Sequence, residues 1–221
     1  MWSYLQTFQR PEVLRREPKK KDKAIPSGNY HIVVVLDESL SMRPERHNII
    51  ASLNNFIDKQ KRIIGGRPTK FTLVKFSDAV ERTLERRSLD SIRPLGYEDY
   101  IPDGNTALYD AIGDTIDWFI HESEVLMVIV TDGAENRSRR YTKASVSQMI
   151  ERQKQRGWTY VYLSNDLSTQ MQGDDIALHT DAQCTNACVP QRAFGSYIAN
   201  SLNDAVAGYR TRGVSVQSQL C

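Results

Sequence analysis

The sequence predicts an α/β fold in which a mostly parallel central β-sheet is covered by helices on both faces. Two observations lead to this class. Runs of consecutive apolar, largely β-branched residues, such as 32–36 and 125–130, are typical of strands that are buried on both faces. Segments with apolar residues at helical spacing alternate with these runs along the chain. Because such helices must bury their apolar faces on the sheet, the alternation indicates one α/β domain.

The first half of the chain is expected to contain three strands and one helix. In chain order these are a strand at 32–36, a helix at 45–64, a strand at 71–76 and a strand at 80–84. The helix should end at Gly65 and Gly66, because glycine favours the C-termini of helices. The strand at 80–84 should pair with the strand before it across a short turn at Ser77 and Asp78.

The second half is expected to alternate helices and strands. In chain order these are a helix at 108–119, a strand at 125–130, a helix at 142–156, a strand at 158–163, a short strand at 176–179 and a helix at 191–210. The last helix places Phe194, Ile198 and Leu202 on one face. The chain shows no internal repeat, which favours a single domain over an array.

Composition and charge limit the classes of function. The 221 residues are 40% hydrophobic and 25% charged, as in ordinary globular proteins. A formal net charge of +2 argues against a dedicated nucleic-acid binder. This charge is uneven, because residues 1–25 carry +4 and the remainder −2. We therefore expect a flexible basic arm at 1–27, one domain at 28–212 and a tail at 213–221.

Targeting signals and cysteine usage indicate a cytoplasmic protein. No apolar run approaches the roughly 20 residues that a membrane-spanning helix needs. The N-terminus lacks the basic and apolar regions of a secretory signal. Three cysteines are too few, and odd in number, for a disulfide framework. We expect Cys184 and Cys188 to be free thiols in a loop, since no second Cys or His pair accompanies them to form a zinc site.

Three polar segments carry the chemistry. Residues 37–42 follow the first buried strand, residues 131–133 follow the strand at 125–130, and residues 103–110 open a helix. Ligands of open α/β sheets bind beyond the carboxyl ends of the strands, so these segments should meet at one edge. They offer carboxylate and hydroxyl oxygens without Cys or His. Such a set suits Mg²⁺ or Mn²⁺ better than zinc.

Together these segments resemble the von Willebrand factor type A domain and its metal-ion-dependent adhesion site. The pattern of that site is Asp-x-Ser-x-Ser, then a Thr, then an Asp after a buried strand. All five positions are present, as Asp37, Ser39, Ser41, Thr106 and Asp132. The surrounding sequence is most similar to small stand-alone type A proteins of bacteria and their viruses.

The resemblance implies a specific fold and specific ligand roles. The fold would be a Rossmann-like open sheet of about six strands with one antiparallel edge strand, for which the strand at 80–84 is the candidate. Ser39 and Ser41 would bind the metal ion directly, and Asp37 and Asp132 directly or through water. Thr106 would join when the site is engaged.

The resemblance also implies a non-catalytic, divalent-metal-dependent module for protein–protein interaction. Two carboxylates only neutralise a divalent ion, so an open coordination position could accept an Asp or Glu of a partner protein. Two alternatives stay open: a metal-dependent hydrolase or phosphatase that uses Asp37, and a structural subunit of a larger intracellular complex. A haloacid-type phosphatase would need a second Asp where Ser39 stands, and the chain has no Gly-x-x-x-x-Gly-Lys loop.

Arginines follow two of the three segments. They are Arg43, Arg46, Arg137, Arg139 and Arg140. We hypothesise that they form a basic rim around the metal site and favour an acidic partner, because complementary charge orients encounter. The alternative is that they are solvated and moderated by Glu45 and Glu135. The four scattered histidines are not expected to bind metal, and the oligomeric state stays open.

Overall fold

The computed structural model describes residues 30–62, 68–165, 167–180 and 184–188. Within them, six strands form one sheet in the order β3-β2-β1-β4-β5-β6. The strands are β1 (Tyr30–Asp37), β2 (Thr69–Phe76), β3 (Val80–Ser88), β4 (Val125–Val130), β5 (Thr159–Ser164) and β6 (Cys184–Cys188). All neighbours pair in parallel except β2 and β3. The structure thus confirms the mostly parallel sheet with its antiparallel edge strand.

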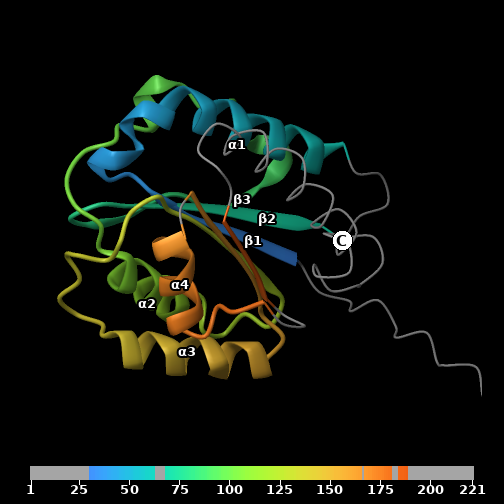
Figure 1. Ribbon diagram of the computed structural model, residues 1–221. Coiled ribbons are helices and arrows are strands. Elements are labelled where there is room, and N and C mark those ends of the chain that lie inside the picture. The colour runs from blue at the N-terminus through green and yellow to red at the C-terminus, as the bar shows by residue number, and fades with distance from the viewer. Residues whose placement is uncertain (1–29, 63–67, 166, 181–183, 189–221) are drawn as a thin grey trace, which may run out of the picture.

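Helices cover both faces of the sheet. They are α1 (Arg46–Lys61), α2 (Leu108–Phe119), α3 (Lys143–Gln155) and α4 (Leu167–Asp175), with short 3-10 helices η1 (Leu40–Glu45), η2 (Leu89–Ser91) and η3 (Tyr97–Asp99). Helix α1 lies over one face, and α2, α3 and α4 lie on the other (Figure 1). This arrangement confirms the two-sided cover that the alternating sequence pattern predicts.

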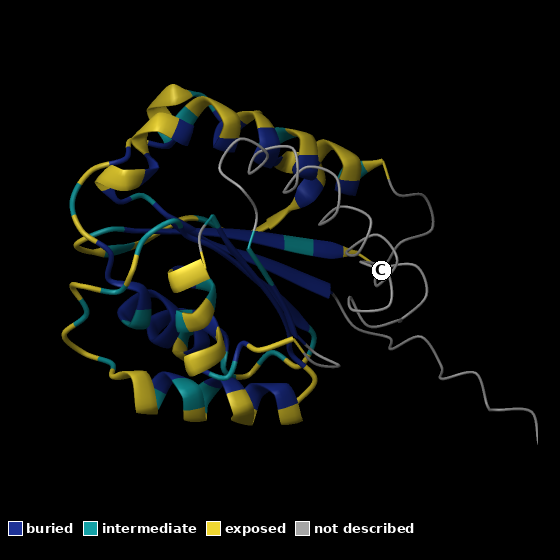
Figure 2. Ribbon diagram, in the orientation of Figure 1, coloured by how far each residue is buried: buried dark blue, intermediate teal, exposed yellow. Residues whose placement is uncertain are grey.

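The core has two layers, one on each side of the sheet. Along β1, Ile32 and Leu36 belong to the layer that includes Phe56 of α1. Val33 and Val35 belong to the layer that α2 and α3 complete. The central strands are buried along their length, as the dark blue ribbon of Figure 2 shows. Because successive strand residues face opposite layers, both must be apolar, which explains the unbroken hydrophobic runs.

The second half of the chain differs from expectation at the edge of the sheet. The strand expected at 176–179 is wrong, because this segment turns back on α4, with Leu178 N donating to Gly173 O at 3.0 Å. The edge strand is β6, so Cys184 and Cys188 lie in a strand and not in a loop. The sequence of β6 has little strand character, and its parallel pairing with β5 provides its backbone partners. The preceding helix α4, with its weakly apolar sequence, was not expected.

Some expectations concern residues outside the described ranges. They are the arm at 1–27, the glycines that end the helix expected at 45–64, the helix at 191–210 and the tail at 213–221. The bounds of the domain therefore stay predictions. Among the described residues, no helix combines the length and apolar character that crossing a membrane requires.

Candidate metal-binding site

The candidate site lies where the chain order of the sheet reverses. Strands β1 and β4 are central neighbours, and the connections that leave them run to opposite halves of the sheet. Their register pairs Leu36 with Val130, so Asp37 and Thr131 emerge side by side at the carboxyl edge. The Thr131 Oγ1 hydroxyl donates a hydrogen bond to Asp37 Oδ2 at 2.6 Å. This switch point is where open α/β sheets bind their ligands.

Asp37 is fully buried and held from several sides. Its Oδ1 accepts a hydrogen bond from Ser39 N at 2.7 Å, and the Tyr100 hydroxyl donates to the Asp37 carbonyl oxygen at 2.6 Å. Burial raises the pKa of Asp37 to about 6, although the hydrogen bonds from Thr131 and Ser39 act in the opposite direction. The hydrogen bonds from Ser39 and Thr131 therefore hold the Asp37 carboxylate in position.

Hydroxyl groups connect the two carboxylates of the site. Ser39 Oγ and Ser41 Oγ are 3.0 Å apart, within hydrogen-bond distance. The Ser41 hydroxyl in turn donates to Asp132 Oδ1 at 2.6 Å. Ser39 is buried and Ser41 is exposed, so the series runs from the interior to the surface. The Asp-x-Ser-x-Ser segment and the segment after β4 thus meet directly.

Thr106 reaches the same cluster across Gly133. A Cβ atom added at Gly133 would lie 2.9 Å from Thr106 Oγ1 and 3.5 Å from Ser41 Oγ. A side chain at position 133 would therefore occupy the space between these hydroxyls. The main chain of Thr106 is held by Asn136, whose Oδ1 accepts from Thr106 N at 2.9 Å.

The five side chains that the sequence singled out therefore come together at one edge of the sheet. All of them offer oxygen, from two carboxylates and three hydroxyls, and such a set fits a small, hard divalent cation. Among the described residues, no group of three or more His, Cys, Asp and Glu side chains could hold a metal. A cation at this edge would consequently depend on hydroxyl ligands. The ligand roles of the five residues stay predictions.

The two arginines after the Asp-x-Ser-x-Ser segment contact other groups of the protein. Arg43 donates to the carbonyl oxygen of Pro102 at 3.3 Å and lies 3.7 Å from a carboxylate oxygen of Asp103. Arg46 donates from Nε to the carbonyl oxygen of Tyr100 at 2.7 Å, and its guanidinium lies 4.9 Å from the Tyr97 ring centroid.

The arginines after β4 divide into paired and unpaired residues. Arg137 forms an ion pair with Asp78 at 2.7 Å, and Arg140 forms two hydrogen bonds with Asp114. Of these three arginines, Arg139 is the one whose exposed guanidinium forms no ion pair within the described part of the chain. Two rim candidates thus have no carboxylate partner among the described residues. They are Arg139 and Arg46, whose contacts are with carbonyl oxygens and an aromatic ring.

Sequence reasoning missed the residues that support the site. Glu38 accepts hydrogen bonds from Lys75 Nζ at 3.0 Å and from Ile101 N at 2.6 Å, which anchors the first segment. Tyr100 and Asn136 hold main-chain atoms of predicted ligands. The sequence did offer a signal for Glu38, because it is a charged residue within the Asp-x-Ser-x-Ser segment. No local pattern identifies Tyr100 or Asn136, because their partners are distant in the chain.

An open sheet with an oxygen-rich cluster at its switch point defines a ligand-binding domain of the doubly wound α/β class. The family model of the von Willebrand factor type A domain matches residues 31–186, and the chain belongs to this family. No curated protein matches the chain significantly.

Solved structures share the fold. Proximal thread matrix protein 1 from the mussel byssus is 19% identical, with a TM-score of 0.52, over 80% of this chain and 46% of that one. The pilus adhesin SpaC from Lactobacillus rhamnosus GG is 12% identical, with a TM-score of 0.65, over 86% and 31%. The SpRpn10 VWA domain is 14% identical, with a TM-score of 0.56, over 77% and 94%. The chain spans less than half of the mussel protein.

Proposed function

We propose that this protein is a divalent-metal-dependent module for protein–protein interaction. The observation that carries the proposal is the convergence of Asp37, Ser39, Ser41, Thr106 and Asp132 at one edge of the sheet, where Gly133 leaves open space beside Thr106 and Ser41. Type A domains commonly mediate protein–protein interactions. The site lies at the switch point, and the exposed Ser41 places its outer end at the surface.

The donor set explains why such a site would bind a partner. Asp37 and Asp132 together balance the charge of a divalent ion, and the three hydroxyls add ligands without further charge. A bound ion would supply an attachment point for a carboxylate. An Asp or Glu of the partner could then approach with little repulsion.

We propose Mg²⁺ or Mn²⁺ as the ion. Oxygen-only ligands suit these hard cations, whereas zinc sites in proteins usually include His or Cys. A structure of the mussel protein is described as having a zinc-occupied site of this type. Zinc is therefore the competitor to include in any binding experiment.

A metal titration tests the site. Isothermal titration calorimetry of the full chain with Mg²⁺, Mn²⁺ and Zn²⁺ should show binding of Mg²⁺ or Mn²⁺, and Ser41→Ala and Asp132→Ala should weaken it strongly. These two positions are not buried, so both variants should fold. Ser91→Ala, at an exposed position of η2, is the matched control and should bind like the wild type. Absence of Mg²⁺ and Mn²⁺ binding by the wild type would refute the proposal.

The interaction itself needs a second experiment. The chain should retain a partner in Mg²⁺ and release it in chelator, and Asp132→Ala should retain none. Arg139→Glu should weaken retention at low salt, because this guanidinium is free to meet an acidic partner segment. Retention that is equal in Mg²⁺ and in chelator would favour a structural subunit, in which the ion holds loops and not a partner.

We propose that the protein is not an enzyme. The alternative hydrolase would use Asp37 as a reactive group. Both carboxylate oxygens of Asp37 accept hydrogen bonds, from Ser39 and Thr131, and the residue is fully buried. An attacking carboxylate needs an oxygen that can reach the substrate. The geometry of Asp37 therefore argues against its use as the attacking group of a hydrolase.

A further inference from the structure

Helix α2 begins without a capping side chain of its own. Its N-cap residue is Ala107, which has no polar side chain to accept hydrogen bonds from the first turn. Two acceptors come instead from the loop after β4. Tyr109 N donates to Glu135 Oε2 at 2.9 Å, and Asp110 N donates to Ser138 Oγ at 2.9 Å. The loop after β4 thus caps a helix that precedes it in the chain.

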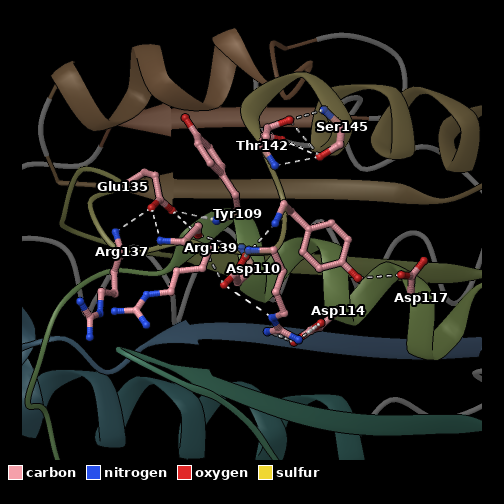
Figure 3. Close-up of polar contacts among 12 residues, drawn as sticks. Tyr109, Asp110, Asp114, Asp117, Glu135, Arg137, Arg139, Thr142 and Ser145 are labelled. Carbon is pink, nitrogen blue, oxygen red and sulfur yellow. Dashed lines mark hydrogen bonds and ion pairs between the residues drawn. The ribbon is translucent and has the colours of Figure 1, made fainter.

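The carboxylate of Glu135 is the centre of this cap. Its Oε1 accepts from Arg137 N at 2.8 Å and from Ser138 N at 2.7 Å, and its Oε2 accepts from Tyr109 N and from the Ser138 hydroxyl at 2.7 Å. Figure 3 shows these contacts converging on Glu135. Both oxygens are therefore used by the protein, and their negative charge lies at the helix N-terminus, where it is favoured.

The contact continues along α2. The carboxylate of Asp110 accepts from three consecutive main-chain N–H groups, those of residues 139, 140 and 141, at 2.9–3.0 Å. Arg140 then binds Asp114, and the Tyr141 hydroxyl donates to Asp117 at 2.7 Å (Figure 3). Residues from the first turn to the last turn of α2 thus contact the loop after β4.

The two segments joined in this way each carry a predicted metal ligand. Thr106 lies directly before the N-cap of α2, and Asp132 lies three residues before Glu135. Asn136 adds a second connection, since its N–H donates to the carbonyl oxygen of Thr106 at 3.1 Å. The position of Thr106 relative to Asp132 therefore depends on how the loop caps the helix.

We propose that Glu135 is a positioning residue for the metal site. It holds Thr106 and Asp132 at the separation that the cation requires, without touching the cation itself. This inference rests on the proposed function. Groups that orient metal ligands change metal affinity by about 10–100-fold when they are replaced.

Glu135→Gln tests the inference with little change of size. The substitution replaces one acceptor oxygen with an NH₂ group that faces N–H donors. We expect the Mg²⁺ affinity from calorimetry to fall by about 10–100-fold. In the metal-free protein, the amides of Thr106 and Tyr109 should exchange their hydrogens faster. This second readout does not depend on the metal.

Asp117→Asn is the matched control. Asp117 contacts the same loop, through Tyr141, but lies at the far end of α2 from the cap. Its variant should keep the wild-type metal affinity. Equal losses in Asp117→Asn and Glu135→Gln would show that any weakening of the loop has the same effect, and would overturn a specific role for Glu135.

Ser138→Ala keeps the inference testable if Glu135→Gln does not fold. It removes the hydroxyl that joins Asp110 N to Glu135 and should weaken Mg²⁺ binding less than the loss of the carboxylate. Unchanged affinity in whichever of the two variants folds would overturn the inference and leave the proposed function intact. A wild type that binds neither Mg²⁺ nor Mn²⁺ would overturn both.

Discussion

Single side chains determine the shape of the candidate site in opposite ways. Asp37 is held in a fixed position, because its carboxylate and its carbonyl oxygen accept hydrogen bonds from Ser39, Thr131 and Tyr100. Gly133 contributes by having no side chain, because a Cβ atom there would crowd the hydroxyl of Thr106. Both effects position oxygen atoms before any ligand arrives. Such preorganisation lowers the cost of binding.

Gly133→Ala tests the importance of this open space. The added methyl group must displace Thr106, so we expect weaker Mg²⁺ binding together with a loss of about 1–3 kcal/mol in the free energy of unfolding. Calorimetry and urea unfolding measure the two effects. Gly96→Ala is the control, since its methyl group would meet only the exposed, flexible side chain of Glu98. Wild-type affinity in Gly133→Ala would contradict the proposed crowding.

At the scale of elements, a polar network ties strands together away from the candidate site. His31 of β1 lies 2.5 Å from Glu122 through Nδ1 and 2.8 Å from the Thr72 hydroxyl of β2 through Nε2. Arg86 of β3 donates from Nε to Glu122 at 2.9 Å. Three strands and the turn before β4 thus share one network. Sequence reasoning left His31 without a role, because its partners are 41 and 91 residues away.

This network predicts a loss of stability in acid. Burial opposes ionisation of Glu122, but hydrogen bonds and charge from His31 and Arg86 outweigh it and lower its pKa to about 2. A carboxylate with a lowered pKa stabilises the fold fully above its unfolded value, here 4.5, and this contribution disappears as the pH falls through 2. Because water screens this partly exposed carboxylate, its contribution is about 2 kcal/mol, less than the shift alone would indicate.

Urea unfolding between pH 2 and pH 6 measures this contribution. Glu122→Gln should be less stable than the wild type at pH 6, and its stability should fall less steeply toward pH 2. Glu81→Gln, at an exposed position of β3, serves as control and should follow the wild-type curve. Parallel curves for the wild type and Glu122→Gln would contradict the role of the network.

For the whole molecule, the candidate site joins segments that are distant in the chain. Its residues come from positions 37–41 and 132, which follow the central strands β1 and β4, and from position 106, which precedes α2. A ligand that binds this arrangement binds only the folded chain. Binding must therefore stabilise the folded state as a whole.

Magnesium should raise the thermal stability of the wild type. At a free concentration 100 times the dissociation constant, the free energy of unfolding rises by about 2.7 kcal/mol. For a domain of this size, the corresponding increase in Tm is roughly 5–10 °C. Chelator should reverse the increase, and Asp132→Ala should show none. A Tm that rises equally in wild type and Asp132→Ala would point to a cation effect elsewhere on the protein.

The strands that are buried on both faces of the sheet were predictable from the sequence. The strand at 125–130 has the same bounds in the structure, because a strand covered on both faces must be apolar throughout. Prediction failed for segments whose structure depends on contacts with other parts of the chain and not on an apolar sequence pattern. Strand β6 contains Thr185 and Asn186, and it forms because β5 offers an edge for parallel pairing. The apolar residues at 176–178 pack into the core without forming a strand.

The sequence by itself determined the α/β class, the order of the central elements and the oxygen side chains that follow β1 and β4. These features depend on local periodicity and on the rule that parallel strands end at a common edge. Only the tertiary structure decided that Glu135 caps α2, that Arg140 is paired while Arg139 is free, and that Gly133 leaves room for Thr106. Those outcomes depend on main-chain donors and on distances between segments, and packing alone brings such segments together.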